Sequence, residues 1–130
     1  MKIEDIIFRG RKKDGEWAYG DLTRFQDGTI SIEVGIRCYE VDPDTVGQYT
    51  GMKDKNGTKI FEGDILVRCE SKYVVRWSRG IGAFVLDREK PYKCRAMLIG
   101  LPPWVSEECQ VIGNIHDGLP KPNNERSGQK

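Results

Sequence analysis

The sequence lacks any apolar run long enough to cross a bilayer, because charged residues make up 32% of its 130 positions and recur along the chain. A membrane-spanning helix needs about 20 consecutive apolar residues. The opening segment, residues 1–5, places two acids before any apolar run, so we do not expect a secretory signal. Lysine plus arginine outnumber aspartate plus glutamate by only 21 to 20, which removes bulk positive charge as a reason to bind membranes or nucleic acid. These features predict a cytoplasmic protein with no membrane partner.

Motifs for catalysis and metal binding are also lacking. The chain contains no phosphate loop, zinc-protease helix, nucleophile elbow or calcium-binding loop. His116 is the single histidine and hence the first candidate for acid–base chemistry, but no spacing assigns it a nucleophile. Glu62 and Asp64 are candidate paired carboxylates, although the glycine between them predicts a turn that separates them. We therefore expect no enzymatic activity, no cofactor and no metal, and a hydrolase is the less favoured alternative.

Close cysteine pairs are absent. The four cysteines, Cys38, Cys69, Cys94 and Cys109, are at least 15 residues apart, whereas a zinc site normally includes a C-x-x-C pair. Disulfides require an oxidising compartment, for which the sequence shows no export signal. We expect free, mostly buried thiols. Two disulfides and a long-range metal site are the alternatives that the spacing leaves open.

Helical periodicity is missing as well. No segment places apolar residues at helical spacing over three turns, and single helical turns are expected only near residues 43–46 and 103–108. Short segments rich in β-branched and aromatic residues alternate with glycine and proline instead. Asp14-Gly15, Asp27-Gly28 and Asn56-Gly57 predict hairpins with two-residue type I′ turns. About ten strands predict an all-β fold, a distorted small barrel or sandwich of short antiparallel strands with extra hairpins.

The length of the chain predicts a single domain over residues 1–118. The last twelve residues, 119–130, contain two prolines and one apolar side chain, which predicts a flexible tail. Strands without covering helices leave sheet edges that must be paired or covered. We therefore expect a homo-oligomer.

Three segments resemble a known family. Residues 48–65 read QYTGMKDKNGTKIFEGDI, residues 111–117 read VIGNIHD, and residues 7–22 include a GEWAYGDL element. All three are similar to elements of the YopX family, which bacteriophages and prophages carry. The resemblance implies a small phage protein of mostly β structure that acts inside the bacterial host. It implies no activity, because the family is functionally uncharacterised, and a host or phage protein is an alternative partner to a second copy.

Turn formation explains most of this signature. In the segment Glu62-Gly63-Asp64 a carboxylate can accept backbone N–H groups across a tight bend while the glycine adopts a positive φ. We therefore expect mainly structural roles for the signature positions. They are Gln48, Tyr49, Thr50, Gly51, Asp54, Asn56, Gly57, Glu62, Gly63, Asp64, Gly113 and Asn114.

The segment 68–95 is the candidate nucleic-acid surface. It holds eight basic and three acidic side chains, with aromatic residues interleaved among them. The basic candidates are Arg68, Lys72, Arg76, Arg79, Arg88 and Lys90. Strand alternation instead places Tyr73, Val75 and Trp77 on one inward face. On that interpretation both Tyr73 and Trp77 are buried, and a protein-binding or self-assembling β module is preferred to a nucleic-acid-binding barrel.

Overall fold

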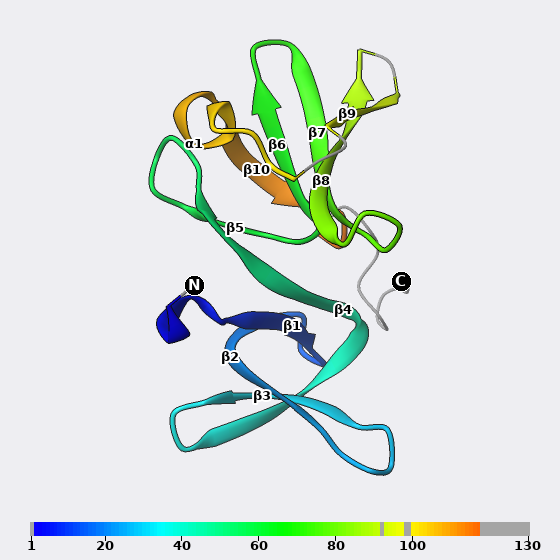
Figure 1. Cartoon of the computed structure of the whole chain (residues 1–130). Helices are drawn as coiled ribbons and strands as arrows, with labels where there is room; N and C mark the ends of the chain where they lie inside the picture. Colours follow the sequence, from blue (N-terminus) through cyan, green and yellow to red (C-terminus); the bar gives the residue numbers. More distant parts are fainter. Residues whose placement is uncertain (1, 92, 98–99, 118–130) are drawn as a thin grey trace. The chain divides into compact units, whose positions relative to one another are not determined.

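The architecture is that of an all-β protein, as the sequence predicts. The computed structural model describes residues 2–91, 93–97 and 100–117 and shows ten strands and two short helices within them (Figure 1). The elements are η1 (Ile3–Asp5), β1 (Phe8–Lys12), β2 (Trp17–Arg24), β3 (Ile30–Val34), β4 (Arg37–Lys53), β5 (Lys59–Phe61), β6 (Asp64–Arg68), β7 (Ser71–Ser78), β8 (Ala83–Lys90), β9 (Cys94–Met97), α1 (Trp104–Glu108) and β10 (Gln110–Asn114). The helical turn expected near residues 103–108 is confirmed as α1.

Residue contacts divide the described chain into two compact units. Unit 1 ends at Tyr49, unit 2 begins at Thr50, and β4 contributes to both. Each unit has its own cluster of buried apolar side chains. A single domain over residues 1–118 stays a prediction, and the tail expected over residues 119–130 lies outside the described residues.

Unit 1 is built on four strands that close on themselves. β1 pairs with β2, β2 with β3 and β3 with β4, all antiparallel, and β1 also pairs with β4. Ala18, Ile32 and Val41 form the buried centre. Closure of a sheet pairs its edges internally. We predicted an oligomer because sheet edges must be paired or covered. In unit 1 much of this edge pairing occurs within one chain.

β4 corrects the prediction of a helical turn near residues 43–46. These residues lie inside the strand, where its register with β1 shifts between Arg9 and Arg11. The amide of Arg11 donates to the Thr45 hydroxyl at 2.9 Å, and that hydroxyl donates to the carbonyl of Asp42 at 2.7 Å. A side chain thus maintains the pairing across a bulge that contains Pro43, a residue without an N–H group. The proline marks an irregularity of a strand rather than a helical turn.

Unit 2 contains an antiparallel sheet of five strands in the order β10-β6-β7-β8-β9. α1 contributes Val105 to the buried cluster, and the Trp104 ring lies 5.7 Å from the Tyr73 ring of β7. The end of β4 and β5 form a hairpin whose Ile60 joins the same cluster. Alternate residues of β7 and β8 thereby face this core, including Val75 and Leu86. The sequence also predicts a strand over residues 95–99; β9 covers Cys94–Met97, and residues 98 and 99 lie outside the described residues.

The glycine-containing turns form as hairpins, but they differ in type from the prediction. In the loop of residues 54–58, the Gly57 amide donates to the carbonyl of Asp54, and the Asp54 amide donates to the carbonyl of Thr58. The loops around Gly15 and Gly28 show the same pair of bonds. In all three the glycine has a positive φ, and the residue before it does not. These are three-residue loops in which glycine alone adopts the left-handed conformation, so type I′ turns were the wrong assignment.

The β6–β7 turn contains a strained residue. Cys69 is the one non-glycine residue with a positive φ, 54°, in the part of the chain that the structure describes, and its side chain is exposed. The left-handed region costs an L-residue free energy that glycine does not incur. We expect Cys69→Gly to raise the free energy of unfolding by about 0.5 kcal/mol. Glycine relieves the backbone strain, but it also increases the conformational entropy of the unfolded chain, which offsets part of the gain.

Urea denaturation with an unchanged slope is the measurement for this variant. Cys38→Gly is the matched control, because Cys38 is also exposed but lies within β4, where glycine weakens a strand. A stability loss in both variants would contradict the strain at Cys69.

Candidate functional site

Asp54 is the most connected residue of the signature. Its buried carboxylate accepts three backbone N–H groups: Oδ1 accepts from Asn56 at 2.8 Å and Thr58 at 2.9 Å, and Oδ2 accepts from Val111 at 2.8 Å. Two of these bonds form the hairpin loop, and the third ties the loop to β10. The amide of Lys55 adds a bond to the carbonyl of Cys109. Asp54 therefore joins segments 57 residues apart in the sequence.

Two further signature positions, Asp64 and Asn114, also organise turns. Asp64 is buried, and its Oδ2 accepts from the Phe61 amide at 2.7 Å across a bend in which Gly63 has a φ of 91°. Asn114 is buried at the end of β10, where its Oδ1 accepts from the amides of His116 and Asp117. These contacts have the geometry that turn chemistry predicts, and they favour structural roles.

The remaining signature positions do not form one site. Gln48 pairs with Phe8 in unit 1, and the amide of the buried Tyr49 donates to the carbonyl of Ile7. Thr50 lies in unit 2, where its hydroxyl donates to the carbonyl of Ile60 at 2.8 Å. Gly51 adopts a φ of 89°, and Glu62 is half-buried. The signature is thus continuous in sequence but divided between the two units.

The basic candidates of segment 68–95 do not share one surface. Arg68 hydrogen-bonds Glu108 at 2.7 Å and lies 4.0 Å from the centre of the Trp104 ring, next to α1. Arg88 is opposite Tyr73 on the core-facing side of β7 and β8, and its guanidinium lies 5.9 Å from the Tyr73 ring. Arg76 lies on the other side, because it is three positions from Tyr73 on the same strand.

Acidic neighbours neutralise part of this segment. Arg76 forms ion pairs with Asp87 at 3.0 Å and with Glu89 at 3.9 Å. Lys72 and Lys90 are exposed and directly opposite each other across β7 and β8, at the end of the strands away from the connecting turn. Two positive charges opposite each other repel, so this pair of lysines is stable only beside an anion or in solvent. The cations are therefore separated into groups rather than gathered into a stripe.

Trp77 corrects the prediction of a buried inward face. Tyr73 is buried as predicted, but Trp77 is 47% exposed although it shares the same side of β7. Its ring packs edge-to-face on Phe84, opposite it on β8, with 5.1 Å between ring centres. Strand alternation gives the correct side, but the packed core ends before the strand does. The prediction failed because residues distant in the sequence determine how much of this side of β7 is buried.

The turn between β7 and β8 extends this exposed group. Ile81 is 44% exposed, and Arg79 is exposed two residues before it. Ser78 fixes the turn, since its carbonyl accepts from the Gly82 amide at 2.7 Å and its hydroxyl from the Ile81 amide at 3.3 Å. We call Trp77, Arg79, Ile81 and Phe84 the hairpin-end surface. Ile81 was missed by the sequence reasoning, although its place between two glycines marks an exposed turn.

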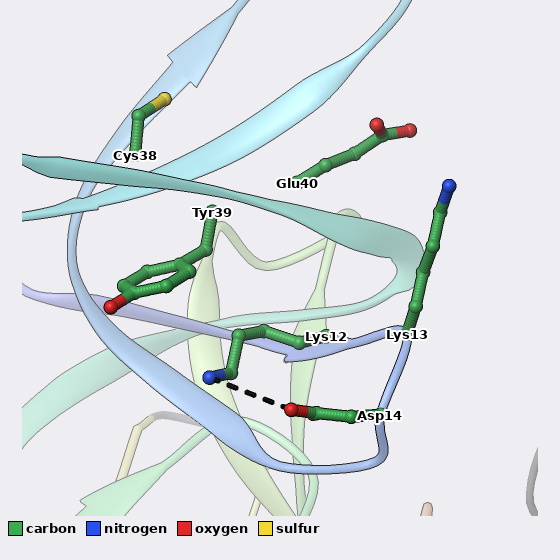
Figure 2. A pocket seen from close by; sticks show the side chains of 6 residues that line it. All are labelled: Lys12, Lys13, Asp14, Cys38, Tyr39 and Glu40. Atoms are coloured by element: carbon green, nitrogen blue, oxygen red, sulfur yellow. Dashed lines mark ion pairs between the residues drawn. The ribbon is translucent and has the colours of Figure 1, made fainter.

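Unit 1 contains a notch in its surface (Figure 2). Its volume is about 390 Å³, and Lys12, Lys13, Asp14, Cys38, Tyr39 and Glu40 line it. The Lys12 ammonium lies 4.4 Å from the centre of the Tyr39 ring and 3.9 Å from the Asp14 carboxylate. Figure 2 shows the Cys38 and Glu40 side chains directed away from that group. Two cations and two anions balance one another here, so the notch has no preference for a ligand of one charge.

The cysteines differ from the prediction of buried thiols. Only Cys109 is buried, and burial raises the pKa of its thiol to about 11. Cys38, Cys69 and Cys94 are free and exposed. Among the described residues, no group of three or more histidine, cysteine and acidic side chains has the geometry to hold a metal ion. His116 lies in the turn that Asn114 organises.

The chain is similar to a family of known proteins. No helix within the described ranges is both long and apolar enough to span a membrane. A search of curated proteins gave no match. The profile of the family described as YopX protein matches residues 4–119, which is most of the chain and includes both units. The chain therefore belongs to the YopX family.

Proposed function

We propose that this protein is a non-enzymatic, phage-encoded binding module that acts in the cytoplasm of a bacterial host through the hairpin-end surface. Family membership supports the phage-type assignment. The observation that carries the binding role is the Trp77 ring, which is 47% exposed and packs edge-to-face on the partly buried Phe84 at the end of the β7–β8 hairpin. Tryptophan and arginine are enriched among the side chains that dominate binding energy at protein interfaces, and an exposed apolar patch, unlike a single exposed side chain, marks an interaction site.

The structure of the hairpin supports this role. β7 and β8 remain paired as far as Ser78 and Ala83, so the rings are held on regular backbone rather than on a long loop. Ser78 fixes the turn that presents Arg79 and Ile81. A rigid surface loses little conformational entropy when it binds. The partner classes are a second copy of this chain, another host or phage protein, and a nucleic acid.

Photo-crosslinking in the host cell tests this proposal. Benzoylphenylalanine in place of Ile81 is expected to give crosslinked adducts on irradiation, and the additional Trp77→Ala substitution is expected to remove them. Benzoylphenylalanine in place of Ile36 is the matched control, because Ile36 is also an exposed isoleucine next to a glycine in a hairpin turn, but of unit 1.

The adducts identify the partner class. A band of twice the chain mass would indicate self-association through this surface, a nuclease-sensitive band would indicate nucleic acid, and other bands would indicate another protein. Absence of adducts at Ile81, or equal yields at Ile81 and Ile36, would contradict a binding role for this surface.

A further inference from the structure

The chain segment that carries the hairpin-end surface has charge of one sign. Residues 71–86, which include β7 and the turn, contain Lys72, Arg76 and Arg79 and no aspartate or glutamate. The nearest acids that follow, Asp87 and Glu89, both pair with Arg76. Within the described ranges no acid forms an ion pair with Arg79, which is exposed and lies two residues after Trp77 in the chain. The surface is therefore apolar and cationic.

An apolar, cationic surface with an exposed indole fits one class of partner. We propose that the hairpin-end surface binds single-stranded nucleic acid, with an unstacked base on the Trp77 ring and a backbone phosphate at Arg79. This inference rests on the proposed binding function and names its partner. Every base has a flat π face, and stacking on aromatic side chains is a main source of affinity for single strands. A guanidinium binds a phosphate oxygen through charge-assisted hydrogen bonds.

The arrangement also predicts which nucleic acids bind. A base in a duplex is stacked on both faces, so an indole at the end of a hairpin reaches only bases that are already unstacked. Stacking and a phosphate contact are independent of base identity, so the affinity changes little with sequence. One ring and a single unpaired arginine predict modest affinity. Phe84 holds the indole in place through their edge-to-face contact, and the adjoining turn adds a further exposed apolar side chain, Ile81.

Fluorescence anisotropy with a labelled 15-nucleotide oligo(dT) and the full chain tests the proposal. We expect saturable binding, with Kd below about 100 μM at ~50 mM salt. Trp77→Ala should weaken it by about 10-fold or more, and Trp77→Phe should retain most of the affinity because a ring remains. Arg79→Ala should weaken binding and reduce the dependence of log K on log salt by about 0.7, the change expected for one lost phosphate contact on a single strand.

Phe25→Ala is the matched control variant. Phe25 is also an aromatic side chain 47% exposed at the end of a hairpin, but it lies in unit 1, and an acid, Asp27, follows it two residues later. We expect this variant to bind oligo(dT) as the wild-type chain does. Circular dichroism and urea denaturation of each variant establish that it is folded, so that a loss of affinity reports the surface.

Three results would overturn the inference. The first is no saturable binding up to 100 μM protein at ~50 mM salt, and the second is equal affinity of the wild-type chain and the folded Trp77→Ala variant. The third is displacement of oligo(dT) by polyglutamate of the same charge as effectively as by unlabelled oligo(dT). The last result would show a site for any polyanion. Protein adducts at Ile81 without oligonucleotide binding would reject nucleic acid while retaining the binding module, so the two proposals fail in distinguishable ways.

Discussion

Replacement of Gly20 by alanine is expected to destabilise unit 1 by about 3 kcal/mol or more, the upper part of the range for overpacked sites. An added Cβ at Gly20 would lie 2.0 Å from the carbonyl oxygen of Glu33 and 3.4 Å from Ile32 Cγ2. The oxygen belongs to the backbone of β3, which is paired with β2 at this point. Because a paired backbone cannot rotate away as a side chain can, relief requires separation of the two strands.

Gly80→Ala and Gly10→Ala are the control variants, for which we expect smaller losses of stability. A Cβ at Gly80 would meet nothing within 4 Å, so its replacement should leave the stability unchanged. A Cβ at Gly10 would lie 2.6 Å from Val41 Cγ2, a side-chain atom that can shift in part, so an intermediate loss is expected. Urea denaturation measures all three variants. A Gly20→Ala chain as stable as Gly80→Ala would contradict the close approach of β2 and β3.

The same variant distinguishes one domain from two. Amide exchange of Gly20→Ala can be followed separately at Ile32, in the core of unit 1, and at Leu86, in the core of unit 2. Faster exchange confined to Ile32 would show that the units unfold independently. Faster exchange at both would support the single domain that the chain length predicts.

Local turn chemistry accounts for most of the fold that could be predicted. Glycine at residues 15, 28 and 57 marked three hairpins, because these loops require a positive φ that glycine adopts without strain. The type of turn was wrong because an Asp-Gly or Asn-Gly pair fits both the two-residue loop and the three-residue loop. Only the register of the flanking strands separates these choices, and that register is set by side chains packing across the sheet.

The continuous course of β4 could not be predicted from its own residues. Pro43, flanked by Asp42 and Asp44, has the composition of a turn. The strand forms because β1 supplies a pairing partner and Arg11 finds an acceptor in Thr45, 34 residues further along the chain. Such long-range bonds override the local preference.

The candidate binding surface shows the same limit. Alternation along β7 gave the correct side for Tyr73, Val75 and Trp77, yet Trp77 is exposed. The cover over this side comes from residues such as Trp104 and Val105, which pack against the Tyr73 part of the core. In the register of β7 with β8, Asp87 is opposite Val74, so its ion pair with Arg76 runs diagonally across the two strands. The sequence alone does not give this register.

Replacement of Asp54 by asparagine is expected to lower the free energy of unfolding by about 2–3 kcal/mol at neutral pH, since bonds to a charged acceptor contribute about 1.5–3 kcal/mol. An amide has one acceptor oxygen, whereas Asp54 accepts from the hairpin loop with Oδ1 and from Val111 with Oδ2. In either orientation an NH₂ group of the variant faces a backbone N–H. Asp27→Asn is the matched control, because Asp27 also accepts from a hairpin amide but is fully exposed, so its loss should be small.

Acid should reduce the difference in unfolding free energy between the wild type and Asp54→Asn. Burial raises the pKa of the Asp54 carboxyl, but the N–H groups of Val111, Thr58 and Asn56 outweigh burial and hold that pKa below its ordinary value of 3.8. A carboxyl with a lower pKa in the folded state stabilises the fold above its unfolded pKa, and this stabilisation is lost as the pH falls through the folded pKa. Urea denaturation at pH 7 and at about pH 3 should therefore show the gap between the two proteins narrowing with acid. Exchange of the Val111 amide should be faster in the variant at neutral pH. A gap that stays constant down to about pH 3, with Val111 equally protected in both proteins, would show that the carboxylate of Asp54 does not hold β10 to the hairpin loop.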